Sequence, residues 1–176
     1  MRMELLALFA ALSTGAQAIA QNGGTSAGTA AKWPPEAKEF QGHHYALYTD
    51  ASKWDSAKFK CQQRGGHLAV VNNAAENSFV WEMAKDQHAV WIGLVRTMGT
   101  WRWVTVSQSE FFNWAPGEPN TATGRKNSRI DVGINACLYG NGLCSDGTRN
   151  TALQGRWSDE PGNCPDITGY VCEWEN

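Results

Sequence analysis

Short apolar or aromatic runs alternate along residues 40–104 with segments whose apolar residues recur at helical spacing. A short run bounded by turn-forming residues is typical of a strand, so each of these runs predicts one. The predicted strands are His44–Tyr48, Leu68–Val71, Val90–Leu94 and Trp101–Val104.

Two helices are predicted between these strands. The first begins near Thr49-Asp50 and ends at Gly65-Gly66, because glycine favours the left-handed geometry found at helix C-termini. The second begins near Ala74 and places Phe79 and Met83 on one face.

After Phe112 the chain is rich in Pro, Gly, Asn and Asp until Gly169–Trp174, which is again typical of a strand. The order of strand, two helices, strands, a long polar loop and a last strand predicts an α+β domain. A loop of this length without regular structure is usually functional.

The first 35 residues differ from the rest of the chain. Residues 1–20 read as a signal peptide, with the apolar stretch Leu5–Leu12 and the small-x-small cleavage site Ala16-Gln17-Ala18. The stretch is too short to span a bilayer. Residues 21–35 are predicted to be a flexible linker, and residues 36–176 form one domain of ordinary size. Because of the signal peptide, we expect the protein to be secreted or extracellular, and periplasmic or on the cell surface if the source is bacterial.

The net charge of −2 and the lack of a basic run argue against nucleic acid and anionic membranes as partners. Five cysteines in an exported chain favour disulfides over metal ligation, and no C-x-x-C pair occurs. An odd count leaves one over, and residue order alone leaves three pairings open for four cysteines. The five are Cys61, Cys137, Cys144, Cys164 and Cys172.

The polar loop contains the chemistry that stands out most, Glu118-Pro119-Asn120. A carboxylate and a carboxamide supply the oxygen donors that Ca²⁺ prefers, and the same groups hydrogen-bond hydroxyls. Trp114 and Trp157 flank the loop and either support it from beneath or expose a ring for stacking. No nucleophile motif or paired acid and base is present, so we expect no enzyme.

Spaced motifs occur in order along residues 40–175: Cys61-x-x-x-Gly65-Gly66-x-Leu68-Ala69-x-Val71, Glu76-x-x-Phe79, Trp91-Ile92-Gly93-Leu94, Glu118-Pro119-Asn120, Cys137, Trp157-Ser158-Asp159, Cys164 and Cys172. Together they resemble the C-type lectin-like domain, in its short form. The resemblance implies an α+β fold with two helices, two small antiparallel sheets and a long polar loop region. It also implies disulfides Cys61–Cys172 and Cys137–Cys164 and leaves Cys144 for an intermolecular bond or as a free or exchanged thiol.

The resemblance further implies one Ca²⁺ site, with a cis bond before Pro119. Mapped onto this sequence, its ligands are Glu118, Asn120, Asn135, Ser158 and Asp159. Asn135 stands where sugar-binding members have Glu, and Ser158 where they have Asn. The formal charge of the site therefore falls from −3 to −2, so we expect weak Ca²⁺ binding, because ligand charge tunes affinity.

The expected function is that of a secreted Ca²⁺-dependent carbohydrate-binding module. In similar proteins the Glu-Pro-Asn order suits mannose-type sugars with equatorial 3- and 4-hydroxyls, which Glu118, Asn120, Asn135 and Ser158 would contact. Low affinity for a single sugar would make a homo-oligomer useful. The altered positions keep an alternative open, a C-type lectin-like domain that binds a protein or another surface ligand without Ca²⁺.

Overall fold

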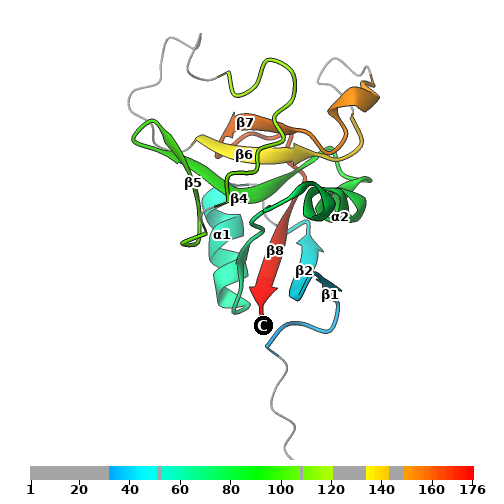
Figure 1. Ribbon diagram of the computed structural model, residues 1–176, viewed down its shortest axis with the longest axis vertical. Coiled ribbons are helices and arrows are strands. Elements are labelled where there is room, and N and C mark those ends of the chain that lie inside the picture. Colours follow the sequence, from blue (N-terminus) through cyan, green and yellow to red (C-terminus); the bar gives the residue numbers. More distant parts are fainter. Residues whose placement is uncertain (1–31, 51–52, 108, 121–133, 143–148) are drawn as a thin grey trace, which may run out of the picture. The chain divides into compact units, whose positions relative to one another are not determined.

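Strand β8 (Gly169–Glu175) is the centre of the fold in the computed structural model (Figure 1). It pairs antiparallel with β2 (His43–Tyr48) and β3 (His67–Leu68), and parallel with β4 (Ala89–Thr97). The structure describes residues 32–50, 53–107, 109–120, 134–142 and 149–176. The predicted signal peptide, most of the predicted linker and Cys144 lie outside these residues.

The remaining strands extend the sheet on both sides of β8. The main path runs β1-β2-β8-β4-β6-β7, while β3 pairs with β8 and β5 pairs with β4. Two antiparallel groups, one around β2 and β8 and one around β4, β6 and β7, are joined by the short parallel pairing of β4 with β8. The new strands are β1 (Lys38–Phe40), β5 (Thr100–Trp103), β6 (Ile134–Tyr139) and β7 (Trp157–Pro161).

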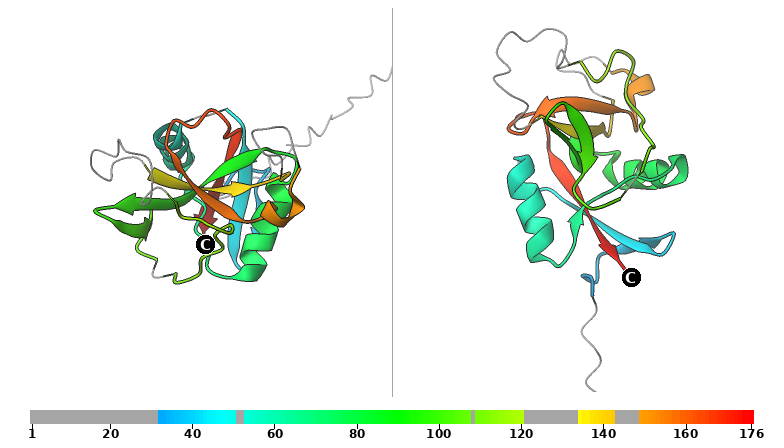
Figure 2. Two further views of the ribbon diagram at one scale, coloured as in Figure 1. Left: turned by 90° about the horizontal axis from the view of Figure 1, so that it is seen from above. Right: turned by 60° about the vertical axis from the view of Figure 1, so that its left-hand side comes forward.

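Helices α1 (Trp54–Gln63) and α2 (Ala74–Ala84) lie on opposite sides of β8 (Figures 1 and 2). Strands β6 and β7 lie above β8 in the view of Figure 1. A short 3₁₀ helix, η1 (Thr151–Leu153), precedes β7. The α+β fold class with two helices is therefore confirmed, whereas the two small antiparallel sheets expected are joined by the pairing of β4 with β8 into one eight-stranded sheet of the described residues.

Local signals explain where α1 ends and where α2 begins. Helix α2 begins after Asn73, whose side chain accepts the Glu76 N–H at 2.9 Å and so satisfies one of the amides left unpaired at a helix start. Helix α1 ends where Gly65, at a φ of +79°, adopts the left-handed conformation. The amide of Gly66 then bonds back to the carbonyl of Cys61 at 3.0 Å, as in a Schellman motif.

Strand β4 separates two apolar clusters, which explains why its residues 89–95 carry no polar side chain. Val90, Ile92 and Leu94 belong to one cluster, and Trp91 belongs to the other. Successive side chains of a strand point to opposite faces, so a strand buried on both faces is apolar throughout. The second cluster also contains the disulfide between Cys61 and Cys172, residues separated by 111 positions in the chain.

The expected disulfide between Cys137 and Cys164 is not formed in the structure. Both residues are free thiols, Cys137 fully buried in β6 and Cys164 half-buried after β7. Both pack in the second cluster. Burial raises the pKa of the Cys137 thiol well above its ordinary value, and the pKa of Cys164 is also raised, first by burial. Such thiols stay protonated and react slowly.

The largest differences from the sequence expectations lie after Phe112. Strands β6 and β7 occupy part of the stretch expected to be loop, and β1 was not expected at all. Helix α1 begins at Trp54, later than predicted, and only the first residue of Leu68–Val71 is in a strand. Trp33 was assigned to the linker, yet its ring stacks on His44 with centroids 3.6 Å apart.

Candidate functional site

The Glu118 loop is held against strand β7 by the backbone. Trp157 donates its N–H to the carbonyl of Asn113 at 2.9 Å, and Ala115 donates its N–H to the carbonyl of Trp157 at 2.8 Å. The loop then turns, with Gly117 at a φ of +86° and the Glu118 N–H bonded to the Ala115 carbonyl at 2.9 Å. These bonds bring Glu118 beside the strand that contains Asp159.

Three of the predicted site residues meet at this point. The Glu118–Pro119 bond is cis, as the resemblance implied. Asn120 donates its backbone N–H to Asp159 Oδ1 at 2.8 Å and its side-chain Nδ2–H to Glu118 Oε1 at 2.9 Å. A carboxylate, a carboxamide and a second carboxylate from distant parts of the chain thus form one cluster.

The electrostatics of this cluster are unfavourable without a counter-charge. Glu118 Oε2 is buried and has no hydrogen-bond partner. The pKa of Glu118 is raised to about 7, first by burial and then by the neighbouring Asp159 carboxylate, and the charge of Glu160 adds to the shift. Burial and a like charge both disfavour the ionised form of a carboxyl. A bound cation would reverse this effect.

The other two predicted residues are placed differently. The Ser158 hydroxyl donates to Glu160 Oε1 at 3.2 Å, so it is already engaged by a carboxylate that was not among the predicted site residues. Asn135 stands in β6 directly opposite Glu160 in the strand pairing, and its side chain is not among those described. Glu160 thus supplies negative charge next to the position where the resemblance calls for a Glu. Its place immediately after Trp157-Ser158-Asp159 was the available signal.

The donor set consists of oxygen atoms, which are the ligands that a hard cation prefers. Glu118 and Asp159 offer carboxylate oxygens, Asn120 offers a carbonyl oxygen, and an orphaned oxygen is already buried. Among the described residues, however, no group of three or more His, Cys, Asp or Glu is arranged to hold a metal ion.

Aromatic side chains support the loop from beneath. Trp157 is fully buried and donates its indole N–H to Asn77 Oδ1 at 2.7 Å. Trp114 packs edge-on against it, with ring centroids 5.8 Å apart. Of the two roles considered for these tryptophans, Trp157 therefore has the supporting one, while Trp114 is half-buried.

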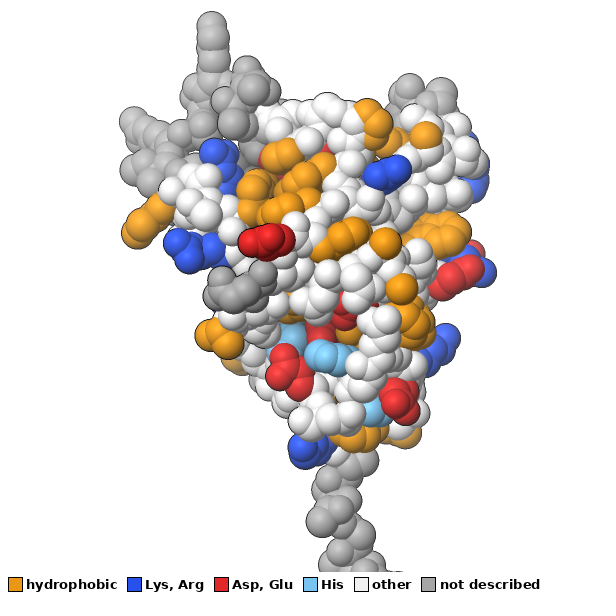
Figure 3. All heavy atoms as spheres, viewed as in Figure 1, with side chains coloured by type: hydrophobic (Ala, Val, Ile, Leu, Met, Phe, Trp, Pro, Cys, Tyr) orange, Lys and Arg blue, Asp and Glu red, His pale blue; other side chains and the backbone are white. Residues whose placement is uncertain are grey.

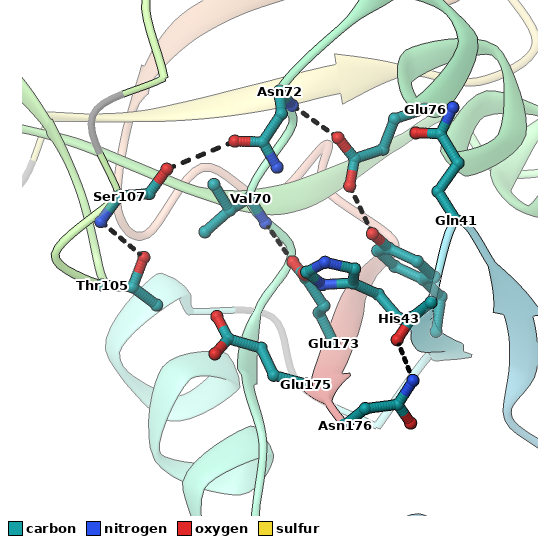
Figure 4. A network of polar contacts seen from close by, with 12 residues as sticks. Gln41, His43, Val70, Asn72, Glu76, Thr105, Ser107, Glu173, Glu175 and Asn176 are labelled. Atoms are coloured by element: carbon teal, nitrogen blue, oxygen red, sulfur yellow. Dashed lines mark hydrogen bonds and ion pairs between the residues drawn. The ribbon is translucent and has the colours of Figure 1, made fainter.

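A second polar cluster ties β2 and β8 to the segment between β3 and α2 (Figure 4). Glu173 is 1% exposed and accepts the Val70 N–H at 2.7 Å, and its other oxygen lies 2.6 Å from His43 Nδ1. Burial raises the pKa of Glu173. Glu76 accepts both the Tyr45 hydroxyl and, at 2.6 Å, the Asn72 N–H. These bonds hold β2, β8, the segment between β3 and α2, and the start of α2 together.

The fold and this loop cluster define a C-type lectin domain. The chain belongs to the family of the lectin C-type domain, whose model matches residues 50–174. Proteins of this family bind carbohydrates, generally with Ca²⁺, and are not enzymes, so the expectation of no catalytic activity holds.

Individual relatives show how far the similarity extends. Asialoglycoprotein receptor 2 of Rattus norvegicus is 31% identical over 137 residues, which are 77% of this chain and 40% of that protein. A perlucin-like protein of Mytilus galloprovincialis is 33% identical over 92 residues, 48% of this chain and 59% of that protein. The chain thus spans less than two thirds of the length of these relatives.

Solved structures agree with the fold. Human lithostathine matches with a TM-score of 0.62 and 27% identity, over 81% of this chain and 99% of that one. The cow C-type carbohydrate-recognition domain of CD23, in the presence of a GlcNAc2Man3 oligosaccharide, matches with a TM-score of 0.61 and 26% identity, over 81% of this chain and 95% of that one. Within the described part of the chain, no helix has the length and apolar character needed to span a membrane.

Proposed function

We propose that this protein is a secreted, Ca²⁺-dependent carbohydrate-binding domain for mannose-type sugars. The observation that carries the proposal is the buried oxygen of Glu118, which has no hydrogen-bond partner and faces the charge of Asp159. Leaving a carboxylate oxygen buried and unpaired is costly, so such a group points to a ligand. The disulfide Cys61–Cys172 supports an oxidising compartment outside the cytosol.

Glu118, Asn120 and Asp159 would hold the ion, with Asn135 and Ser158 as further oxygen donors. When bound, Ca²⁺ supplies a positive centre that accepts two neighbouring hydroxyls of a sugar in place of water. Glu118 accepts and Asn120 donates hydrogen bonds to the same hydroxyls. The bond between Asn120 and Asp159 keeps the donor in place before the sugar arrives.

The order of acceptor and donor selects the sugar. Glu118 precedes Asn120 in the loop, the order that suits equatorial 3- and 4-hydroxyls in similar proteins. The relative solved in the presence of GlcNAc2Man3 is consistent with a mannose-type ligand. Binding of one sugar by few hydrogen bonds is weak, so several copies of the domain on one assembly would be needed for firm attachment to a surface.

A second candidate function is Ca²⁺-independent binding of a protein or another surface ligand. The specific observation that favours it is the absence, among the described residues, of a group of three acidic, His or Cys side chains arranged around one point. The Ser158 hydroxyl is also engaged by Glu160.

Retention on mannose-agarose tests the proposal against this second candidate. Wild-type protein is expected to bind in Ca²⁺ and to elute with a chelator or with free mannose. Glu118→Gln is expected to pass through the column, whereas Glu39→Gln, which removes an exposed carboxylate on β1, is expected to bind like the wild type. Wild-type protein that is not retained in Ca²⁺ would rule out the proposed function.

A further inference from the structure

A pocket with a volume of about 460 Å³ opens beside strand β5, away from the residues that would hold the ion. Pockets that bind small molecules have volumes in this range. On the face drawn in Figure 3, hydrophobic side chains gather in the upper half with acidic and basic side chains at their edge. The pocket is lined by Trp101, Arg102, Trp103, Ser107, Glu110 and Phe112, among others.

One wall of the pocket is fixed by hydrogen bonds that are already made. Two hydrogen bonds hold Ser107 in place. Its backbone N–H donates to Thr105 Oγ1 at 3.2 Å, and its hydroxyl donates to Asn72 Oδ1 at 3.2 Å (Figure 4). The Ser109 hydroxyl donates to the carbonyl of Val71 at 2.9 Å. These bonds attach the wall to the segment before α2, so the pocket has its shape before any ligand enters.

Two side chains of opposite charge at the pocket make no polar contact with the described residues. Arg102 and Glu110 both line it and are both exposed, and neither has a hydrogen bond or ion pair to any described residue. Elsewhere on the described surface, Lys60 pairs with Asp50 and Lys85 pairs with Glu82. A guanidinium and a carboxylate in one pocket offer both donors and acceptors to a polar ligand.

A row of aromatic rings connects the pocket to the Glu118 loop. The ring centroids of Trp101 and Trp114 lie 4.9 Å apart. Phe112 stacks on Trp114, with 6.3 Å between the ring centroids and an angle of 11° between the rings. Trp114 directly precedes Ala115, whose carbonyl accepts the Glu118 N–H. Phe112 is 45% exposed, so part of its ring is open to a ligand in the pocket.

We propose that this pocket is a second carbohydrate subsite, which holds one hexose residue of an oligosaccharide without Ca²⁺. A pyranose ring has an apolar face that stacks on Trp101 or Phe112 and a rim of hydroxyls that Arg102 and Glu110 hydrogen-bond. An alkyl chain offers neither Arg102 nor Glu110 a hydrogen-bond partner, so it fits the lining less well. The inference deepens the proposed function, because the aromatic row leads from the pocket to the Glu118 loop.

Titration with mannose and with α-linked mannotetraose measures the contribution of the pocket. In Ca²⁺ the wild type is expected to bind the tetraose about tenfold more tightly than mannose. The double variant Arg102→Ala, Glu110→Gln is expected to lose this advantage and keep its affinity for mannose. Lys38→Ala with Glu39→Gln removes one exposed charge of each sign from β1 and is expected to match the wild type.

Measurement in a chelator separates this subsite from the proposed function. With Ca²⁺ removed, the tetraose is expected to shift the indole N–H signals of Trp101 and Trp103 in nuclear magnetic resonance spectra. The shift is expected to persist in Glu118→Gln and to vanish in the Arg102 and Glu110 double variant, whose unchanged melting temperature shows that it is folded.

Two outcomes would overturn the proposal. Unmoved indole signals together with an unchanged double variant would show that the pocket takes no sugar, even if Ca²⁺-dependent retention on mannose-agarose succeeds. Signals shifted by sodium octanoate and not by the tetraose would assign the pocket to an alkyl chain. A protein that fails on mannose-agarose but shows the chelator-resistant shift would lose the proposed function and keep this subsite.

Discussion

Asn120 donates its backbone N–H to Asp159 Oδ1 at 2.8 Å, and so joins the Glu-Pro-Asn loop to strand β7, 39 residues later in the chain. This bond holds one carboxylate of the candidate ion site next to the other. The proximity raises the pKa of Glu118 to about 7. Neutral pH is therefore the region in which the site changes its charge.

The stability of the ion-free protein is expected to fall as the pH rises from about 4.5 to about 7. In this range unfolded chains release the Glu118 proton, while the folded chain still holds it, because its pKa is raised. Stability falls with pH wherever the unfolded state binds fewer protons. Melting curves in a chelator check this, and Glu118→Gln is expected to flatten the pH dependence. An equally steep dependence in Glu118→Gln would assign the effect to other groups.

Asn135→Glu is expected to strengthen Ca²⁺ binding and to weaken the ion-free fold. The new carboxylate would face Glu160 across the β6–β7 pairing, and like charges directly opposite in a sheet are destabilising. A bound cation offsets that repulsion, and each added negative ligand raises affinity. Calorimetry in Ca²⁺ and melting in a chelator measure the two effects. Adding Glu160→Gln is expected to restore the ion-free stability, and no change in either quantity would contradict the placement of the site.

The two pairs of cysteines are expected to respond differently to substitution. Replacing Cys61 and Cys172 by Ala should lower the free energy of unfolding by about 4–5 kcal/mol, because their disulfide closes a loop of 111 residues. Cys164→Ser should cost less than about 1 kcal/mol, since its thiol is half-buried and free. Urea unfolding without reductant measures both. A loss of several kcal/mol for Cys164→Ser would reveal the pairing with Cys137 that the resemblance implied.

Glu173→Ala is expected to lower the free energy of unfolding by about 3 kcal/mol or more. The change leaves the buried Val70 N–H without its acceptor and removes the partner of His43. Glu175→Ala is the matched control, because Glu175 lies on the same strand with a side chain that is 64% exposed. Urea unfolding of both variants is the measurement, and equal losses would contradict the role given to the buried network.

The sequence predicted the elements whose signals are local. Helix α2 starts at Ala74 as expected because Asn73 caps it, and β8 matches because Tyr170–Cys172 and Trp174 give it an apolar and aromatic run. Strands β6 and β7 were not predicted, because their pairing depends on contacts far along the chain. Their segments contain the Asn, Ser, Asp and Pro that usually mark turns. For the site, the resemblance of the spaced motifs to a known family predicted Glu118, Asn120 and Asp159 together. It did not predict Glu160, which becomes relevant only through its pairing opposite Asn135.

Calorimetric titration of the wild type and Glu118→Gln with Ca²⁺ at pH 8 tests the central claim most directly. The Glu118 carboxyl is mostly ionised at this pH, because its pKa is about 7. The account predicts one saturable site for the wild type, with a dissociation constant of about 10⁻³ M, and loss of that binding in Glu118→Gln. No heat of binding and no rise in melting temperature at about 10 mM Ca²⁺, a concentration well above that constant, would contradict it.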